Sequence, residues 1–311
     1  MIPALVFEAV TRCFARTVAL DGLSLTVGPG QIVGLVGRNG AGKTTALRLA
    51  LGDLYPDRGS IRVLGLDPIR DGLAVREQVS LLAEENALYP WMKVGEILRL
   101  AGALHPRWDA QVADTLARKL DLEPGKKVAA LSRGGRAKVA LVLAVACRPR
   151  LLLLDDPTAG LDPLVRREVL EGILETIHAE GGTVIYASHL VEDIERIADR
   201  VVVLDEGRIT LDGAVDDLKQ RIRRATAVFD GRVPSLEGLP GKIRSVVEGR
   251  VLHLVVDAQR PELLGVLEQA GARTVEFRYA WTAPWDRPAG LALSLATLAG
   301  MAGAAWRRRR R

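Results

Sequence analysis

Apolar and polar residues follow two different patterns in the first sixty-five residues. They alternate around residues 4–7 and 23–27, which predicts antiparallel strands with a turn at 28–30. The largely apolar run at 31–36 is typical of a buried strand, and residues 60–65 predict another short strand. The chain therefore begins with a mainly β region.

Residues 93–148 have helical spacing instead. Apolar residues recur three and four positions apart over 93–104 and 108–120, which predicts two amphipathic helices. Residues 137–147 are apolar on all sides, so we expect a buried helix there. Together these stretches predict a helical subdomain at about 93–148.

Unbroken apolar runs return at 151–154, 183–187 and 201–204. Helical stretches near 163–180 and 190–198 separate them. Apolar runs that alternate with helices indicate a mainly parallel sheet with both faces covered.

The pattern changes again beyond about residue 222. Short strands at 225–229, 242–247 and 251–256 and a helix at 261–270 predict a small α+β module. We therefore place domain boundaries at 1–221 and 222–285, with a separate tail at 286–311.

The tail is apolar, rich in Ala and Gly, and ends in five arginines. A membrane span would place those arginines outside the cell, against the positive-inside rule. We expect a helix docked on protein or lying on an anionic membrane surface, and a disordered tail is the alternative.

Composition narrows the class of protein. The 311 residues are 48% hydrophobic and 26% charged, as in a globular protein with a sizeable core. Two distant cysteines indicate a reduced compartment, and the N-terminus lacks the features of a signal peptide, so we expect a cytoplasmic protein. The net charge of +5 equals the charge of the terminal arginines, so basicity is weak evidence for nucleic acid.

Residues 37–44 read Gly-Arg-Asn-Gly-Ala-Gly-Lys-Thr and match the phosphate-binding pattern GxxxxGK[ST]. The match follows a predicted strand and precedes a predicted helix at 46–51, which is the context that this motif needs. Its glycines let backbone amides turn toward an anion, and the helix N-terminus adds further donors. Lys43 can reach the β- and γ-phosphates, and the Thr44 hydroxyl can bind Mg²⁺.

Further motifs follow in order. They are Leu-Ser-Arg-Gly-Gly at 131–135, four leucines and two aspartates at 151–156, Ala-Gly-Leu-Asp at 159–162, and His189 after a strand. Each alone has an ordinary structural explanation, such as a helix cap, a core strand or a packed histidine. Jointly and in this order, they resemble the nucleotide-binding subunits of ATP-binding cassette (ABC) transporters, most closely the bacterial ABC-2 type exporters. The resemblance covers residues 1 to about 220.

The resemblance implies an α/β fold of the P-loop NTPase class. It has a RecA-like core, an antiparallel β subdomain and a helical subdomain, to which the α+β module is added. It implies ATP and Mg²⁺ as cofactors. It also implies a polytopic membrane permease and a second nucleotide-binding subunit, identical or paralogous, as partners at the cytoplasmic face of the membrane.

The resemblance also assigns nucleotide-binding residues. Phe14 stands where an aromatic ring stacks on adenine. Phosphates and Mg²⁺ are held by the loop residues Gly37, Asn39, Gly40, Ala41, Gly42, Lys43, Thr44 and Thr45. Ser132 and Gly134 bind the γ-phosphate of the nucleotide held by the other subunit, and Asp162 couples the two sites.

Four acids and bases complete the implied site. Glu84 stands at the position of a metal-binding glutamine, and a carboxylate there can still bind Mg²⁺. Asp155 is the acid in the second shell of the metal, Asp156 occupies the position of the general base, and His189 contacts the γ-phosphate and the attacking water. Phosphoryl transfer asks for this kind of positioning and charge neutralisation.

Three positions depart from the family pattern, namely Glu84, already described, Asp156 and Arg133. Asp156 replaces a glutamate, so its carboxylate retreats by about 1.5 Å, and a 1 Å misplacement costs roughly 10²-fold in rate. Hydrolysis is therefore slow, or Asp156 works through an intervening water. Arg133 replaces a glycine and points to a phosphate or to solvent. The run 89–92, Tyr-Pro-Trp-Met, is a socket for a membrane subunit or ordinary core.

The alternative class is a soluble ABC ATPase that acts on nucleic acid or the ribosome. Such members carry two cassettes or a long inserted coiled coil, and this sequence has neither, so we expect no nucleic acid. An import ATPase is a lesser alternative within the transporter class.

Overall fold

The structure is a computed structural model that describes residues 1–83, 88–159, 161–162, 165–166, 168–171, 181–234, 242–257 and 262–279. The chain divides into two compact units, Met1–Asp212 and Gly213–Arg311. Within the described residues, no helix is both long enough and apolar enough to cross a membrane.

A three-stranded antiparallel sheet opens the first unit. It consists of β1 (Leu5–Phe14), β2 (Thr17–Val27) and β4 (Arg58–Val63), in the order β2-β1-β4. The expected antiparallel strands are confirmed. The hairpin turn between β1 and β2 lies at residues 15–16, where Ala15 has a φ of 50°, and the turn at 28–30 leads on to the next strand.

The second sheet of this unit carries the candidate site. Its order is β5-β6-β7-β3-β8-β9, and the pairs from β5 through to β8 are parallel. The bounds are β3 (Ile32–Val36), β5 (Val79–Leu82), β6 (Leu151–Asp155), β7 (Thr183–Ser188), β8 (Arg200–Asp205) and β9 (Arg208–Ala214). The predicted parallel sheet is confirmed. The sequence patterns missed β5, which has only four residues, and β9, whose residues alternate between exposed and half-buried.

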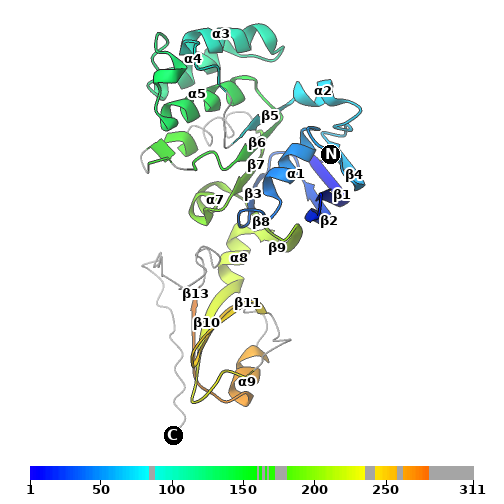
Figure 1. The fold of residues 1–311 in the computed structure, drawn as a ribbon, viewed down its shortest axis with the longest axis vertical. Coiled ribbons are helices and arrows are strands. Elements are labelled where there is room, and N and C mark those ends of the chain that lie inside the picture. The colour runs from blue at the N-terminus through cyan, green and yellow to red at the C-terminus, as the bar shows by residue number, and fades with distance from the viewer. Residues whose placement is uncertain are drawn as a thin grey trace. The chain divides into compact units, whose positions relative to one another are not determined.

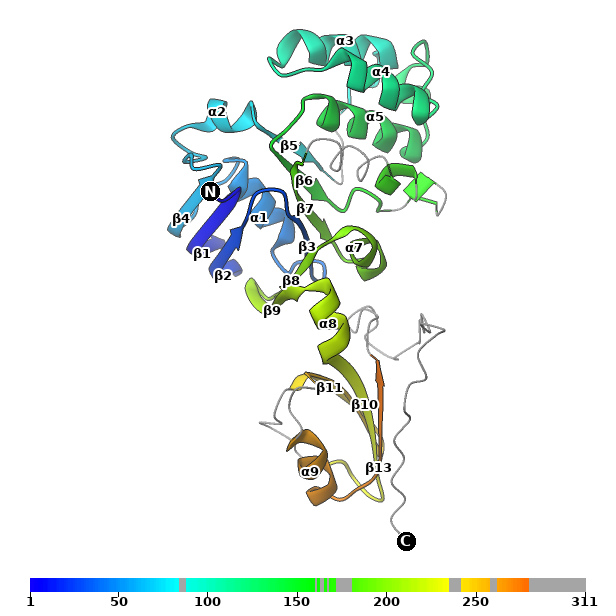
Figure 2. The ribbon, with the colours of Figure 1, turned by 180° about the vertical axis from the view of Figure 1, so that it is seen from behind.

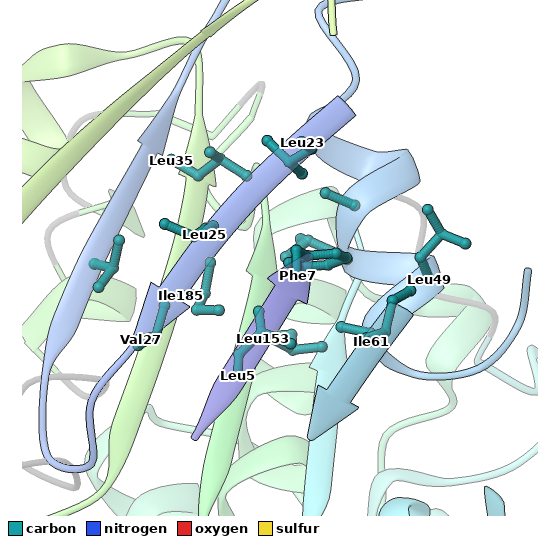
Figure 3. Packing of buried hydrophobic residues seen from close by; sticks show 14 of the residues in the cluster. Leu5, Phe7, Leu23, Leu25, Val27, Leu35, Leu49, Ile61, Leu153 and Ile185 are labelled. Carbon is teal, nitrogen blue, oxygen red and sulfur yellow. The ribbon is translucent and has the colours of Figure 1, made fainter. Parts of the chain in front are cut away.

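The hydrophobic core fills the space between these two sheets and around α1 (Lys43–Ala50). Figure 3 shows Leu5, Phe7 and Ile61 of the small sheet facing Leu153 and Ile185 of the large one. All are nearly inaccessible to solvent. Burial of this apolar area is the main stabilising contribution, and it holds the loop after β3 between two layers.

Helices form a separate part of the first unit, as expected (Figures 1 and 2). They are α3 (Val94–Leu104), α4 (Ala110–Lys119), a 3₁₀ turn at Val128–Ala130 and α5 (Arg133–Ala146). Helix α5 begins four residues before the predicted apolar run because Ser132 caps it, and most of its side chains are buried as predicted. Two shorter helices, α2 (Gly72–Arg76) and α7 (Val191–Ile197), also belong to this unit. Within the predicted helical stretch 163–180, the described residues 165–166 and 168–171 are helical, and the rest lies outside the described residues.

The second unit is an antiparallel sheet with one packed helix. Its elements are α8 (Val215–Arg221), β10 (Ile222–Phe229), β11 (Lys242–Glu248), β12 (Val251–Asp257), α9 (Glu262–Gln269) and β13 (Ala272–Tyr279). The strand order is β11-β12-β10-β13. The predicted strands and helix are present, and β13 is a further strand that the sequence patterns missed. The boundary proposed between residues 221 and 222 falls inside this unit, at the junction of α8 and β10, and the tail at 286–311 lies outside the described residues.

Candidate functional site

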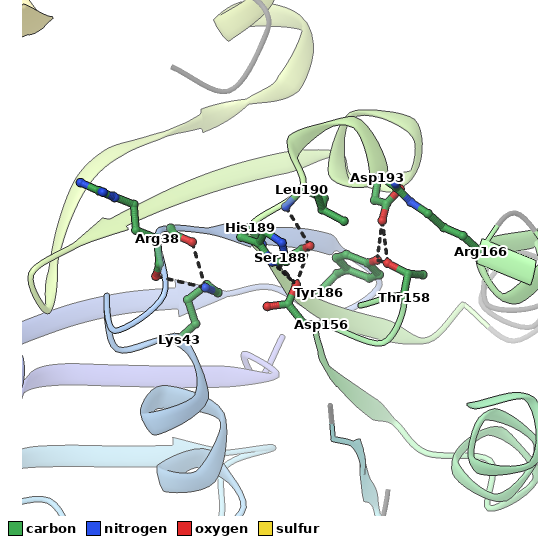
Figure 4. A network of polar contacts seen from close by, with 11 residues as sticks. Arg38, Lys43, Asp156, Thr158, Arg166, Tyr186, Ser188, His189, Leu190 and Asp193 are labelled. Carbon is green, nitrogen blue, oxygen red and sulfur yellow. Dashed lines mark hydrogen bonds and ion pairs between the residues drawn. The ribbon is translucent and has the colours of Figure 1, made fainter. Parts of the chain in front are cut away.

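Three neighbouring parallel strands end at the same edge of the large sheet. Strand β7 lies between β6 and β3, with Asp155 opposite Ala187 and Val36 opposite Ser188. The segments that follow the three strands therefore start side by side, although the one after β3 lies more than a hundred residues before the other two in sequence (Figure 4). Ligands of open parallel sheets bind at such carboxyl edges.

Glycines shape the loop between β3 and α1 for steric reasons. A Cβ on Gly37 would lie 2.4 Å from the Leu204 carbonyl oxygen, and one on Gly42 would lie 2.4 Å from that of Ala19. Gly42 also has a φ of 106° and Gly40 a φ of 83°, which side chains disfavour. The loop backbone is thus held in close contact with the backbone of Ala19 and Leu204. On its other side, Asn39 and Gly40 are exposed.

Lys43 and the start of α1 complete a cradle for an anion. The Nζ atom of Lys43 donates to the carbonyl oxygens of Gly37 at 2.9 Å and Arg38 at 3.3 Å, and only 6% of this residue is exposed. Gly42 caps α1 without a side-chain hydrogen bond, so the first amides of the helix are offered to a ligand. A buried ammonium group beside the first amides of a helix suits a polyphosphate.

Hydroxyl and carboxylate oxygens that could bind a metal ion lie next to this phosphate-binding loop. The Thr44 side chain is exposed in the first turn of α1, followed by the half-buried Thr45, and Asp155 is buried at the end of β6. Hydroxyl and carboxylate oxygens are the ligands that Mg²⁺ prefers, together with substrate phosphates. Within the part of the chain that the structure describes, no group of three or more His, Cys, Asp or Glu side chains could hold a metal alone. The donors fit a Mg²⁺ ion that arrives with the nucleotide.

Asp156 is joined to His189 across the strand ends. Its Oδ1 atom accepts hydrogen bonds from the Ser188 hydroxyl at 2.8 Å and the His189 backbone amide at 3.2 Å, and lies 3.0 Å from His189 Nδ1. Asp156 has a φ of 42°, and its amide donates to the Ala187 carbonyl oxygen. The carboxylate is therefore held against β7, where it fixes the orientation of the imidazole.

The Ser132–Gly135 motif forms the N-terminus of α5. The Ser132 hydroxyl accepts from the Gly135 amide at 3.1 Å, and a Cβ on Gly134 would lie 3.0 Å from Val165. Asp162 in turn accepts at Oδ1 from the Val165 amide at 3.1 Å. The structure thus brings Gly134 close to the short segment that follows Asp162. Arg133, the first residue of α5, is exposed.

The remaining predicted residues lie as follows. Phe14 ends β1 with 41% of its surface exposed, and the Arg12 guanidinium lies 4.8 Å from the centre of its ring. One ring face is therefore engaged in a cation–π contact. Ala41 is buried in the loop. Glu84 lies outside the described residues.

Sequence reasoning missed the polar residues behind this site. Ser188 hydrogen-bonds Asp156, and the buried side chains of Thr158, Tyr186 and Asp193 lie next to it in Figure 4. Polar residues inside apolar runs, such as Tyr186 within 183–187, were the only signal in the sequence that singled them out.

Known proteins resemble the chain in sequence and fold. Residues 20–159 match the ABC transporter family. The ATP-binding protein YtrB of Bacillus subtilis (strain 168) is 32% identical over 211 residues, 68% of this chain and 72% of that protein. The daunorubicin resistance ATP-binding protein DrrA3 of Streptomyces coeruleorubidus is 36% identical over 221 residues, 70% of each chain.

A relative named for import is also similar. The aliphatic sulfonates import ATP-binding protein SsuB 3 of Pseudomonas savastanoi pv. phaseolicola (strain 1448A / Race 6) is 38% identical over 213 residues, 68% of this chain and 77% of that protein. A solved structure of an ATP-binding subunit of an ABC transporter superimposes with a TM-score of 0.63 at 28% identity, over 70% of this chain and 92% of the other. The chain therefore belongs to the ABC transporter family, as an ATP-binding subunit with an ATPase activity that is coupled to transport.

Proposed function

We propose that this subunit hydrolyses Mg²⁺–ATP at the loop between β3 and α1 and drives an exporter from the cytoplasmic face of the membrane. The observation that carries the proposal is the convergence of Lys43, Asp156 and His189 at one sheet edge. Helix amides and an ammonium group bind the triphosphate there, and a carboxylate–imidazole pair lies beside them.

Each residue of the loop has a role in binding. The amides of Asn39, Gly40, Ala41 and Gly42 and the ammonium of Lys43 bind phosphate oxygens, with Gly37 and Thr45 completing the loop. Phe14 offers its free ring face to adenine. Thr44, Asp155 and Glu84 serve the Mg²⁺ ion, which neutralises charge on the β- and γ-phosphates when it is bound.

Asp156 and His189 act on the attacking water. His189 is oriented by the Nδ1 contact with Asp156, so its Nε2 atom faces away from that carboxylate. Since Asp156 is short and held toward β7 by three donors, we propose that hydrolysis is slow and that the ATP-bound state is long-lived.

A second subunit completes the site. Ser132 and Gly134 would bind the γ-phosphate held by the partner, which is a second copy or a paralogue, and Asp162 would couple the two sites. The Ser132 hydroxyl already accepts a bond from Gly135, yet its proton remains available to a phosphate.

The dimer is tested by its nucleotide dependence. Full-length protein carrying Asp156→Asn, which blocks hydrolysis, is expected to dimerise with Mg²⁺–ATP in sedimentation experiments. Gly134→Val should weaken that dimer at unchanged ATP affinity. An Asp156→Asn protein that stays monomeric at saturating ATP contradicts the composite site.

An exposed aromatic pair supports a membrane partner. Tyr89 and Trp91 are 47% and 69% exposed, and their ring centres lie 5.3 Å apart. Exposed aromatic residues are the usual anchors of protein interfaces. We propose that they receive a cytoplasmic segment of the permease.

Two features favour export within the transporter class. The chain is similar to a daunorubicin resistance protein over 70% of its length. Its second unit is one four-stranded antiparallel sheet with a helix, unlike the barrel-like regulatory domain of some importers. We also propose that the tail at 286–311 contacts anionic lipid.

Purification from detergent-solubilised membranes tests the partner. Tagged protein is expected to retain a polytopic membrane protein, and Trp91→Ala should reduce the retained amount by roughly 10-fold. Tyr55→Ala, at another exposed aromatic residue, is the matched control and should change nothing. Ribosomes or nucleic acid in place of a membrane protein would establish the alternative class.

A further inference from the structure

A second polar cluster lies directly behind Asp156 and His189. We call it the Asp193 cluster, and it comprises Thr158, Arg166, Tyr186 and Asp193 (Figure 4). Asp193 Oδ2 accepts from Thr158 Oγ1 at 2.7 Å and from the Tyr186 hydroxyl at 3.2 Å. Asp193 Oδ1 accepts from Arg166 Nε at 2.6 Å. The Thr158 and Tyr186 hydroxyls are themselves 3.1 Å apart.

Because the cluster is buried, its polar groups must keep their hydrogen-bond partners. Thr158 and Asp193 are each 1% exposed and Tyr186 is 0% exposed. Burial, and then the charge of Asp193, raise the pKa of Tyr186 well above its usual value, so the hydroxyl stays protonated and can donate. A buried carboxylate needs such donors, since an unpaired buried charge is costly. Both oxygens of Asp193 are therefore committed to fixed partners.

The cluster connects the two residues of the hydrolytic pair. Thr158 comes two residues after Asp156, Tyr186 lies on β7 two residues before Ser188, and Asp193 lies on α7 four residues after His189. The hydroxyl contacts thus link the segment after Asp156 to the strand and helix on either side of His189.

Arg166 extends the same cluster to the Asp162 segment. Its backbone amide donates to the Asp162 carbonyl oxygen at 2.9 Å, and its side chain ends on Asp193. Asp162 also caps the amide of Val165. Arg166 thus joins the Asp162 segment to Asp193 on α7.

We propose that Thr158, Tyr186 and Asp193 are positioning residues that hold Asp156 and His189 in register with Asp162. A second subunit that contacts the Asp162 segment would in this way set the rate of hydrolysis. The inference rests on the proposed roles of Asp156, His189 and Asp162. The Lys43 ammonium donates to the carbonyl oxygens of Gly37 and Arg38, and we expect changes in the cluster to leave ATP binding unaffected.

Variants that remove only a hydroxyl test this inference. In full-length protein with saturating Mg²⁺–ATP, Tyr186→Phe and Thr158→Val are each expected to lower kcat by roughly 10-fold, since a displacement of about 1 Å costs up to ~10²-fold. The Kd for ATP should stay within about 2-fold of wild type. Thr158→Ser keeps the hydroxyl and should restore kcat. Single-turnover measurements with enzyme in excess make even slow rates accessible.

A matched control lies at the other end of β7. Thr183 is also buried, and its hydroxyl accepts from the Gly30 amide at 2.9 Å. Thr183→Val should lower the melting temperature as Thr158→Val does, yet leave kcat unchanged. If either variant in the cluster fails to fold, Arg166→Gln at the partly exposed rim gives the same comparison.

Several results would overturn the inference. These are an unchanged kcat in Tyr186→Phe and Thr158→Val, an equal loss in Thr158→Ser or Thr183→Val, or a parallel rise in the Kd for ATP. The proposed function fails separately, if Asp156→Asn and His189→Ala hydrolyse ATP as fast as wild type.

Discussion

The phosphate-binding loop and the Asp156–His189 pair lie at the same sheet edge but are built in opposite ways. The loop is one continuous segment, and its shape depends on glycines that lie against the backbone of Ala19 and Leu204. The pair comes from the ends of two strands and is joined by side-chain hydrogen bonds. The shape of the loop depends on its backbone conformation, whereas the Asp156–His189 pair exists only because two strands end next to each other.

This difference separates binding from turnover. Backbone amides and one lysine bind the phosphates, so we expect ATP affinity to depend little on the residues at the ends of β6 and β7. A carboxylate acts in hydrolysis only if it is placed within a fraction of an ångström. We therefore expect changes in the loop to alter affinity and changes in the pair to alter rate.

The largest expected effect comes from removing the carboxylate charge of the pair. Asp156→Asn should lower kcat by roughly 10³-fold, because general-base contributions are of the order of 10²–10⁴. The Kd for ATP should change little. Initial rates of phosphate release measure this, with Asp205→Asn at an exposed acid as the control. A rise in the Kd for ATP as large as the loss in kcat would contradict the separation of binding by the loop from hydrolysis by the Asp156–His189 pair.

Removal of the loop lysine should have the next largest effect, on affinity. Lys43→Ala loses a buried ammonium that binds phosphate, which is worth about 2–3 kcal/mol, or roughly 10²-fold in Kd. Equilibrium titration with a fluorescent ATP analogue gives the value. Lys126→Ala, at an exposed lysine paired with Glu123, should bind like wild type. Equal affinities of the two variants would refute the role of the loop.

Lengthening the short acid tests whether placement limits the rate. Asp156→Glu should raise kcat by roughly 10-fold, because the carboxylate then reaches further from β7 toward the γ-phosphate. The same phosphate-release assay detects the gain. An unchanged or lower kcat would mean that Asp156 works through an intervening water. It would also mean that its hydrogen bonds with Ser188 and His189 contribute more to the rate than a shorter distance between the carboxylate and the γ-phosphate.

An effect of similar size, but on affinity, is expected at the adenine contact. Phe14→Ala should raise the Kd for ATP by roughly 10-fold and leave kcat unchanged, since stacking of a base on an aromatic ring contributes ~1–3 kcal/mol. The same titration measures it, with Val18→Ala on the neighbouring strand as the control. An effect on kcat in place of Kd would show that Phe14 belongs with the pair.

Several parts of the fold could be predicted because local patterns determine them. Unbroken apolar runs predicted β3, β6, β7 and β8 as parallel strands, and helical spacing predicted α3 and α4. Strands β5, β9 and β13 were missed. Strand β5 is four residues long, and β9 shows only partial burial, so neither carries enough periodicity to be recognised. Their pairing partners, which lie far away in sequence, decide that they are strands.

The sequence by itself determined the nucleotide loop, the order of the motifs and the family to which the chain is similar. These depend on short runs of residues and on glycines whose backbone freedom is local. Only the tertiary structure decided that Asp156 is held by Ser188 and His189, and that Thr158, Tyr186 and Asp193 form a buried cluster behind them. Residues some thirty positions apart meet there because parallel strands β6 and β7 end side by side. No local pattern encodes such contacts, since they arise from strand pairing and from the need of buried polar groups for partners.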